Sequence, residues 1–271
     1  MKRKALIVGS VALVLIIALV AGIVLASANA RWPQQGKDVV RDSKLKIDRT
    51  NIKEGYFYAC TTSKTRKKLK LRVIKGNTTL TYDLNGEGEM EVFPLQLGDG
   101  NYKIALYENI SGKSYSAAGT AYLQVKLADQ VSPFFYPNQY VNYTEQSEVV
   151  GKADSLCENK NQREAFEDIC AYMKSNFGYD FIKAATIKAG QLPDIDGSYK
   201  KKMGVCQDLS AIMVAMLRSQ GIPAKLMIGY ADKTYHAWIT AIIDGKEEFY
   251  DPTAQLGALK KTKTYTVERF Y

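Results

Sequence analysis

The hydrophobic positions of this 271-residue chain follow three successive patterns. The first is continuous: residues 5–30 are uncharged and mostly aliphatic, and Lys2, Arg3 and Lys4 precede them. Roughly 20 apolar residues suffice to cross a bilayer, and a positive flank stays in the cytoplasm. Residues 1–30 are therefore predicted to be a transmembrane signal anchor, with the rest of the chain outside the cytoplasm. Ala28-Asn29-Ala30 also fits a signal-peptidase site, so cleavage and secretion are the alternative.

The second pattern is an alternation of apolar and polar residues. It follows residues 31–43, which are predicted to be a linker, and it occupies residues 44–130 in short runs separated by turn signals such as Asn85-Gly86. The clearest alternating positions are Leu69, Leu71, Val73, Leu80, Tyr82, Leu84, Tyr102, Ile104 and Leu106. Strands spaced at about ten residues predict an all-β, immunoglobulin-like sandwich, which we expect to be a spacing or binding module.

The third pattern is helical and lies in residues 131–271, which are predicted to form an α+β domain. An aromatic stretch at 131–144 opens it, either as an interdomain joint or as a glycan or peptide surface. A first helix is expected to end near Phe177-Gly178. A second begins at Cys206, because apolar residues recur there at helical offsets, and Gly221-Ile222-Pro223 ends it. Residues 192–199 are expected to form a loop over the cleft.

A β-hairpin is predicted near the end of this domain. Asp244-Gly245 is a strong two-residue turn signal, and it separates the apolar run 235–243 from residues 246–251. If that dipeptide is the turn, His236 and Asp251 lie on one face of the sheet as diagonal neighbours. Trp238 shares this face, where it either lines the cleft or belongs to the core.

Three side chains of this domain have complementary chemistry. Cys206 lies in the first turn of its helix, where free backbone N–H groups and the helix dipole stabilise a thiolate. His236, the only histidine of the chain, can accept its proton, and Asp251 can orient the imidazole. A nucleophile, a base and an orienting carboxylate are the components of covalent acyl transfer.

The motifs around these residues resemble those of the transglutaminase-like superfamily, circularly permuted relatives of papain-type cysteine proteases, here as a bacterial member that is membrane-anchored or exported. The resemblance covers roughly residues 150–260, and the motifs are Gly204-Val205-Cys206, Met216-Leu217-Arg218, Gly221-Ile222-Pro223-Ala224, His236-Ala237-Trp238 and Asp251-Pro252-Thr253. It implies a nucleophile helix packed on an antiparallel sheet. It also implies that Cys206 is the nucleophile, His236 the general base and then acid, and Asp251 the orienting residue.

The resemblance also implies an oxyanion site. The backbone N–H of Cys206 is its natural first donor, and Gln191, Tyr199 and Gln207 are unranked candidates for the second. The expected function is acyl transfer or hydrolysis at amide bonds of peptides or proteins at the cell envelope, through a thioester on Cys206. The alternative is a catalytically silent envelope protein that binds or scaffolds.

Composition narrows the partners. The formal charge is +9, which favours anionic wall polymers or lipid headgroups, and the chain has no recognisable nucleic-acid-binding motif. One histidine with distant cysteines matches no zinc spacing, so neither a metal nor a cofactor is expected. Cys157 and Cys170 either form a bridge or, with Cys60, are buried thiols. Asp208 would oppose a thiolate if it pointed at the sulfur, so we expect it to point away.

Overall fold

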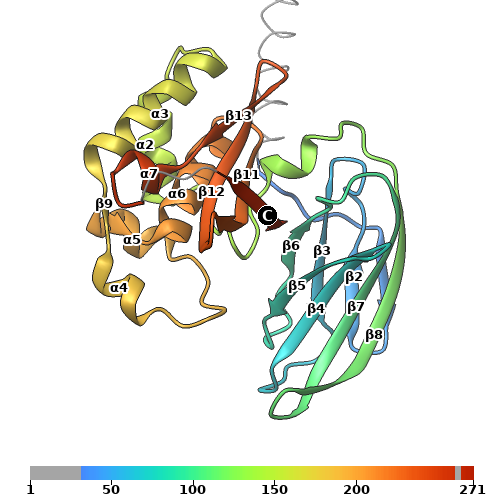
Figure 1. Cartoon of the computed structure of the whole chain (residues 1–271). Coiled ribbons are helices and arrows are strands. Elements are labelled where there is room, and N and C mark those ends of the chain that lie inside the picture. Colours follow the sequence, from blue (N-terminus) through green and yellow to red (C-terminus); the bar gives the residue numbers. More distant parts are fainter. Residues whose placement is uncertain (1–31, 260–263) are drawn as a thin grey trace, which may run out of the picture. The chain divides into compact units, whose positions relative to one another are not determined.

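A computed structural model describes residues 32–259 and 264–271 (Figure 1). The predicted anchor and its cleavage site, residues 1–30, lie outside the described residues. In the part that is described, no helix combines the length and the apolar character needed to cross a bilayer. Residues 34–271 belong to one unit, in which two β-sheets are followed along the chain by an α+β part.

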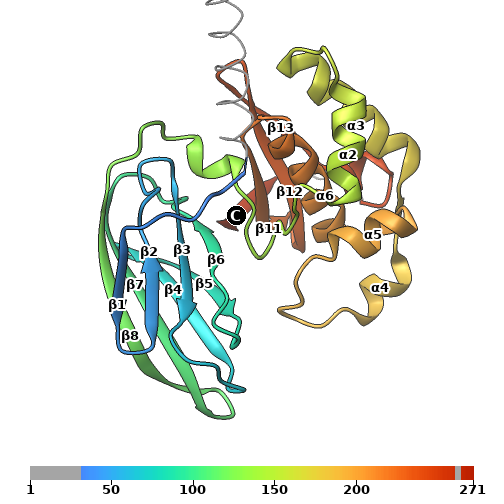
Figure 2. The same cartoon turned by 180° about the vertical axis from the view of Figure 1, so that it is seen from behind.

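The first part consists of two four-stranded antiparallel sheets. One has the order β1-β2-β3-β6 and the other β5-β4-β7-β8. Their strands are β1 (Val39–Asp42), β2 (Leu45–Asp48), β3 (Tyr56–Thr61), β4 (Leu69–Lys75), β5 (Thr78–Leu84), β6 (Glu91–Pro94), β7 (Gly100–Ser111) and β8 (Ser114–Val125). The sheets form two layers (Figure 2), and the rings of Tyr82 and Phe93 meet between them at 5.3 Å. The alternation is confirmed, because Leu69, Leu71 and Val73 are all buried. The immunoglobulin likeness stays a prediction.

Strand β1 lies within residues 31–43, where the sequence predicts only a linker. It pairs with β2 through a turn at Ser43, which has a φ of 50°. Most β1 side chains are exposed, so the strand is held by backbone hydrogen bonds and leaves no hydrophobic alternation to detect.

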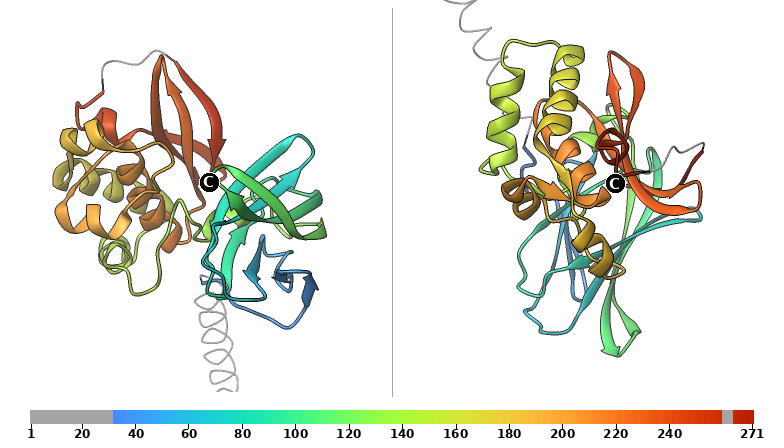
Figure 3. Two further views of the ribbon diagram at one scale, coloured as in Figure 1. Left: turned by 90° about the horizontal axis from the view of Figure 1, so that it is seen from below. Right: turned by 60° about the vertical axis from the view of Figure 1, so that its left-hand side comes forward.

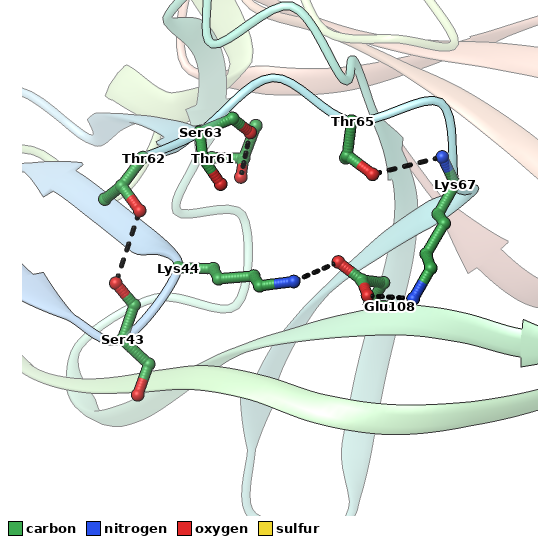
Figure 4. Close-up of polar contacts among 8 residues, drawn as sticks. All are labelled: Ser43, Lys44, Thr61, Thr62, Ser63, Thr65, Lys67 and Glu108. Carbon is green, nitrogen blue, oxygen red and sulfur yellow. Dashed lines mark hydrogen bonds and ion pairs between the residues drawn. The ribbon is translucent and has the colours of Figure 1, made fainter.

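An ion-paired glutamate connects strands of this part (Figure 4). Glu108 in β7 accepts from Lys44 at 2.6 Å and from Lys67 at 2.7 Å. Hydrogen bonds from these two lysines lower the pKa of Glu108 below its ordinary value. The pairing explains how a carboxylate is accommodated at a strand position with little exposure.

The aromatic stretch that follows β8 packs its rings into the protein. It contains the short helix η1 (Ser132–Phe135), and Phe134, Tyr136 and Tyr143 are buried. The ring of Tyr136 lies 4.3 Å from that of Tyr56 in β3. This burial is what the joint interpretation of residues 131–144 expects, and it leaves little of these rings for a binding surface.

The second part packs helices on an antiparallel sheet with the order β13-β12-β11-β14. The strands are β11 (Ala224–Ala231), β12 (Thr234–Ile243), β13 (Lys246–Tyr250) and β14 (Tyr265–Phe270), and a separate two-stranded sheet pairs β9 (Gly178–Tyr179) with β10 (Met203–Gly204). The helices are α2 (Glu148–Cys157), α3 (Gln162–Asn176), α4 (Phe181–Thr186), α5 (Ile195–Lys201), α6 (Cys206–Ser219) and α7 (Pro252–Gln255). Helices α2 and α3 lie side by side (Figure 3).

Helix α6 is the central element of this part. Every residue from Asp208 to Ser219 is buried, and the helix contacts α2, α3, β11 and β12. Both predicted helices are confirmed, since α3 ends at Asn176 and α6 begins at Cys206. Gly221 follows α6 with a φ of 68°, a left-handed conformation that glycine adopts without strain. The burial of α6 fixes the direction in which its first turn, and therefore Cys206, points.

The prediction of a loop at residues 192–199 is wrong in part, because α5 forms there. Asp194 caps this helix, and its carboxylate accepts the N–H of Gly197 at 2.9 Å. Asp194 therefore acts as a helix N-cap. The helix is too short for a periodic apolar face to be visible in the sequence.

All four cysteines are free thiols, so the predicted alternative of a bridge between Cys157 and Cys170 is not formed. Cys60 and Cys157 are buried and Cys170 is half-buried. These three side chains behave as small apolar residues of the core.

Candidate active site

The β12–β13 hairpin forms in the register that the sequence predicts. Asp244 and Gly245 make the turn with φ values of 51° and 75°, and Ile243 pairs with Lys246. The pairing continues to Ile239 and Tyr250, and Asp251 follows directly as the N-cap of α7. The strand therefore delivers Asp251 to the same face of the sheet as His236.

His236 and Asp251 form a buried hydrogen bond. Nε2 of His236 lies 2.9 Å from Oδ2 of Asp251, and the two residues are only 3% and 2% exposed. The other carboxylate oxygen, Oδ1, accepts the backbone N–H groups of Thr253 at 3.0 Å and Ala254 at 3.1 Å. The first turn of α7 therefore fixes the orientation of the carboxylate, and the carboxylate in turn orients the imidazole.

Cys206 is the first residue of α6 and is half-buried. Its side chain lies within hydrogen-bonding reach of the His236 ring. Because Nε2 of that ring faces Asp251, Nδ1 is the nitrogen left for the sulfur. The structure therefore brings together all three predicted site residues, from the start of a helix, the first half of a strand and the cap of a second helix.

The electrostatics of the site favour a charged imidazole. Burial alone would lower the pKa of His236, but its hydrogen bonds to Asp251 and Cys206 outweigh burial and raise this pKa to about 9. Burial alone would likewise raise the pKa of Asp251, but the hydrogen bond from His236 and those from Tyr265 and Ala254 lower it below its ordinary value. At neutral pH the carboxylate is ionised, and it stabilises an imidazolium beside the sulfur.

Tyr265 is a site residue that the sequence analysis missed. It is the first residue of β14, and its hydroxyl donates to Oδ2 of Asp251 at 2.8 Å. Its ring lies 5.0 Å from that of Trp238 and 4.8 Å from that of Phe249. Trp238 is almost fully buried, so of the two roles considered for it, the core role fits. The alternation of Tyr265, Val267 and Arg269 was a signal for this strand, but nothing local indicated the contact with Asp251.

Three residues were candidates for a second oxyanion donor, and the hydrogen bonds that two of them make, Gln207 and Tyr199, are to groups other than Cys206. Nε2 of Gln207 donates to the backbone carbonyl of Gln191 at 2.9 Å. The hydroxyl of Tyr199 lies 3.1 Å from that of Tyr172, and the residue is buried. The backbone N–H of Cys206 remains the donor that helix geometry supplies, because it has no partner within the first turn.

The carboxylate of Asp208, which was expected to point away from the sulfur, is bound by backbone donors. Its carboxylate accepts the backbone N–H groups of Val205 at 3.0 Å and Asp194 at 2.9 Å. Among the residues described, no group of three or more His, Cys, Asp or Glu side chains is arranged to hold a metal ion.

The chain has a remote likeness to several solved structures. The first, a candidate cysteine protease from Cytophaga hutchinsonii, is 17% identical over 79% of this chain and 78% of its own, with a TM-score of 0.40. The periplasmic domain of TgpA from Pseudomonas aeruginosa is 13% identical over 83% of this chain and 78% of its own, with a TM-score of 0.37. Red sea bream transglutaminase is 12% identical over 73% of this chain and 48% of its own, with a TM-score of 0.31. Likenesses at this level are similarities alone, and no activity follows from them.

The family comparison is more specific. No curated protein matches the chain. The family described as the transglutaminase-like superfamily matches residues 152–250, a stretch that includes Cys206 and His236 and ends one residue before Asp251. Residues 152–250 therefore form a domain of the transglutaminase-like superfamily.

Proposed function

We propose that this protein is a cysteine enzyme that acts outside the cytoplasm on amide bonds of peptides or proteins at the cell envelope, by acyl transfer or hydrolysis. The observation that carries the proposal is the convergence of Cys206, His236 and Asp251, with Nε2 of the imidazole 2.9 Å from the carboxylate and the Cys206 side chain within hydrogen-bonding reach of the ring. The location rests on the apolar, basic-flanked run at residues 2–30.

The proposed first step forms a thioester. The thiolate of Cys206 attacks the amide carbonyl carbon, and the carbonyl π electrons move to oxygen, where the N–H of Cys206 stabilises the charge. The electrons then re-form the carbonyl as the C–N bond breaks, and the imidazolium of His236 gives its proton to the leaving amine or ammonia. Asp251 keeps the ring in position while its charge changes.

The second step regenerates the thiolate. Neutral His236 takes a proton from water or from a primary amine, whose oxygen or nitrogen attacks the thioester carbonyl, and the C–S bond breaks. Water yields a carboxylic acid, and an amine yields a new amide. Both outcomes use the same three side chains, so the acceptor that reaches the thioester decides between hydrolysis and cross-linking.

The proposal predicts that one thiol of the four is reactive near neutral pH. Burial raises the pKa of Cys157 to about 11 and that of Cys170 to about 12, and it also raises the pKa of Cys60. Brief treatment of the full chain with iodoacetamide at pH 7, followed by peptide mass spectrometry, should label Cys206 first. His236→Ala should slow this labelling by at least about tenfold.

The matched control is Tyr235→Phe, at the neighbouring position on the opposite face of β12, where half of the side chain is exposed. This variant should label at the unaltered rate. The enzyme proposal fails if Cys206 labels no faster than Cys60, or if His236→Ala leaves the rate unchanged; either result favours a silent binding protein. A glutamine peptide, with and without a primary amine, then separates deamidation from cross-linking by product mass.

A further inference from the structure

A carboxylate lies fully buried beside the proposed nucleophile. Asp208 is the third residue of α6, two positions after Cys206, and has no exposed surface. Besides the N–H groups of Val205 and Asp194, its Oδ2 contacts Nζ of Lys183 at 2.7 Å. This single carboxylate is therefore bound by the N-cap residue of α6, by the N-cap residue of α5 and by a lysine in the first turn of α4.

The position of this carboxylate has two opposing effects on the nucleophile. Its hydrogen bond to the N-cap residue fixes the first turn of α6, which benefits Cys206 because a thiolate needs that turn in a defined place. Its negative charge, however, lies within about one helical turn of the sulfur and opposes a second negative charge there. A neutral capping side chain would give the first effect without the second.

Lys183 supplies a positive charge that offsets the negative charge of Asp208. Its side chain is 20% exposed, so solvent screens the pair only in part. Two hydrogen bonds position the segment that carries Lys183. The Asp180 carboxylate accepts the backbone N–H of Lys183 at 2.7 Å, and the backbone N–H of Asp180 donates to Gly204 O at 3.0 Å. The segment that carries the ammonium group is therefore hydrogen-bonded to the strand that leads into Cys206.

The packing beside Asp208 is close at Gly204. A Cβ atom on Gly204 would lie 2.8 Å from Cβ of Asp208 and 3.3 Å from Cβ of Ser198. Contacts between carbons at 2.8 Å do not occur without displacement, so the residue before the N-cap must be glycine for Asp208 to fit. Because Asp208 is fully buried, water does not stabilise its charge, and a neighbouring group has to compensate it.

We propose that Lys183 and Asp208 form a positioning pair for the nucleophile: Asp208 holds the first turn of α6, and Lys183 neutralises its charge so that the thiolate of Cys206 is not opposed. Neither side chain is required to touch the substrate. The inference rests on the proposed function, in which the thiolate is the reactive species.

The charged and titratable groups around Cys206 come from three elements. His236 faces it from β12, with Asp251 behind the ring. Tyr179 lies near it on β9, and burial first, with the charge of Cys206 in addition, raises the pKa of this tyrosine. Asp208 belongs to α6 itself. Lys183 acts through Asp208, so changing it alters the field at the sulfur without removing a reacting group.

The test is the pH dependence of Cys206 alkylation by iodoacetamide in the full chain. Lys183→Met keeps the length of the side chain and removes its charge, so it should move the midpoint of the rate increase to higher pH by about half a unit or more. At any pH below the midpoint this corresponds to an alkylation rate roughly threefold lower or more. Lys183→Arg should restore the midpoint. The matched control is Lys188→Met, at an exposed position of the same segment, which should leave it unchanged.

A second variant should shift the midpoint of the alkylation profile in the opposite direction. Asp208→Asn keeps the size of the side chain, removes the negative charge and leaves Lys183 uncompensated, so it should move the midpoint to lower pH. A purely structural pair would loosen the helix start in both variants and shift both midpoints in the same direction. Shifts in the same direction, or no shift in either variant, would overturn the proposal.

Circular dichroism shows whether each variant is folded. If Lys183→Met does not fold, Asp208→Asn decides alone: a lower midpoint supports the proposal, and an unchanged or higher one overturns it. The proposed function is tested separately by His236→Ala. If this variant alkylates Cys206 at the unaltered rate, the proposed function fails, but the direction of the midpoint shift in Lys183→Met and Asp208→Asn can still be measured. The two failures are therefore distinguishable.

Discussion

Tyr265 donates its hydroxyl to the same oxygen atom of Asp251 that faces the imidazole. Oδ2 of Asp251 lies 2.8 Å from the Tyr265 hydroxyl and 2.9 Å from Nε2 of His236. Because Oδ1 is already bound by two backbone N–H groups, the tyrosine does not orient the carboxylate by itself. Its hydroxyl instead competes with the imidazolium for the negative charge on Oδ2, and so it weakens the pairing of Asp251 with His236.

Tyr265→Phe should therefore strengthen the pairing of the imidazolium with Asp251. Phenylalanine keeps the ring contacts with Trp238 and Phe249 but removes the donor. We expect the pH at which the His236 ring loses its proton to rise by about half a unit. The measurement is an NMR titration of this ring, the only imidazole of the chain, between pH 5 and 10. Tyr230→Phe, on β11 with its side chain partly exposed, is the control; a titration midpoint that stays in place or moves down contradicts the role assigned to Tyr265.

The hairpin shows why part of this site could be predicted from sequence. A two-residue turn with left-handed conformations at Asp244 and Gly245 leaves a single register for the strands, and period-two alternation then assigns each side chain to a face. His236 and Asp251 are only 15 residues apart, so their relationship follows from local rules. The start of α6 at Cys206 also follows from a local, helical periodicity.

The contacts that were missed depend on tertiary packing. Tyr265 reaches Asp251 from β14, an edge strand on the far side of β11, and no turn or periodicity connects the two. Lys183 and Asp208 are likewise distant in the sequence, and they meet because Asp180, the N-cap of α4, is hydrogen-bonded to Gly204 just before α6. Short elements such as β1 and α5 have too few residues to show a hydrophobic pattern, so their hydrogen bonds and caps are visible only in the structure.

Arg218 is a buried cation on the nucleophile helix, and it makes a prediction about stability. Its guanidinium donates to three backbone carbonyls, those of Ala224 at 2.9 Å, Tyr136 at 2.6 Å and Tyr271 at 2.9 Å. Burial lowers the pKa of Arg218 to about 10, which is still well above neutral pH. Arg218→Met would leave these three carbonyls without their donor and should lower the free energy of unfolding by about 3 kcal/mol.

The measurement is thermal unfolding at pH 7, where a loss of this size lowers the Tm by roughly 10 °C. Arg218→Lys should recover less than half of the loss, because an ammonium group cannot match the planar fork of donors. Arg66→Met, at an exposed loop position, is the control and should change the Tm by at most about 2 °C. Equal effects at positions 66 and 218 would mean that the three carbonyl contacts contribute nothing.

The raised pKa of His236 predicts how activity and stability respond to alkaline pH. A histidine whose folded-state pKa of about 9 exceeds its ordinary value near 6.5 contributes stability that is fully present below pH 6.5. This contribution is lost as the pH rises from there through 9. The imidazolium–thiolate pair, and with it the proton that His236 gives to the leaving amine, should therefore persist through neutral pH and decline near pH 9.

Asp251→Asn should remove this behaviour. Without the carboxylate charge, burial is the dominant influence on His236, and the midpoint of the imidazole titration, followed by NMR, should fall by about two pH units. The drop in Tm between pH 6.5 and 9 that His236 causes should shrink in parallel. Asp244→Asn is the matched control, because it makes the same chemical change at the exposed hairpin turn, where asparagine also adopts a left-handed conformation. If the titration midpoints of His236 in the two variants coincide, the charge of Asp251 does not hold the proton on His236.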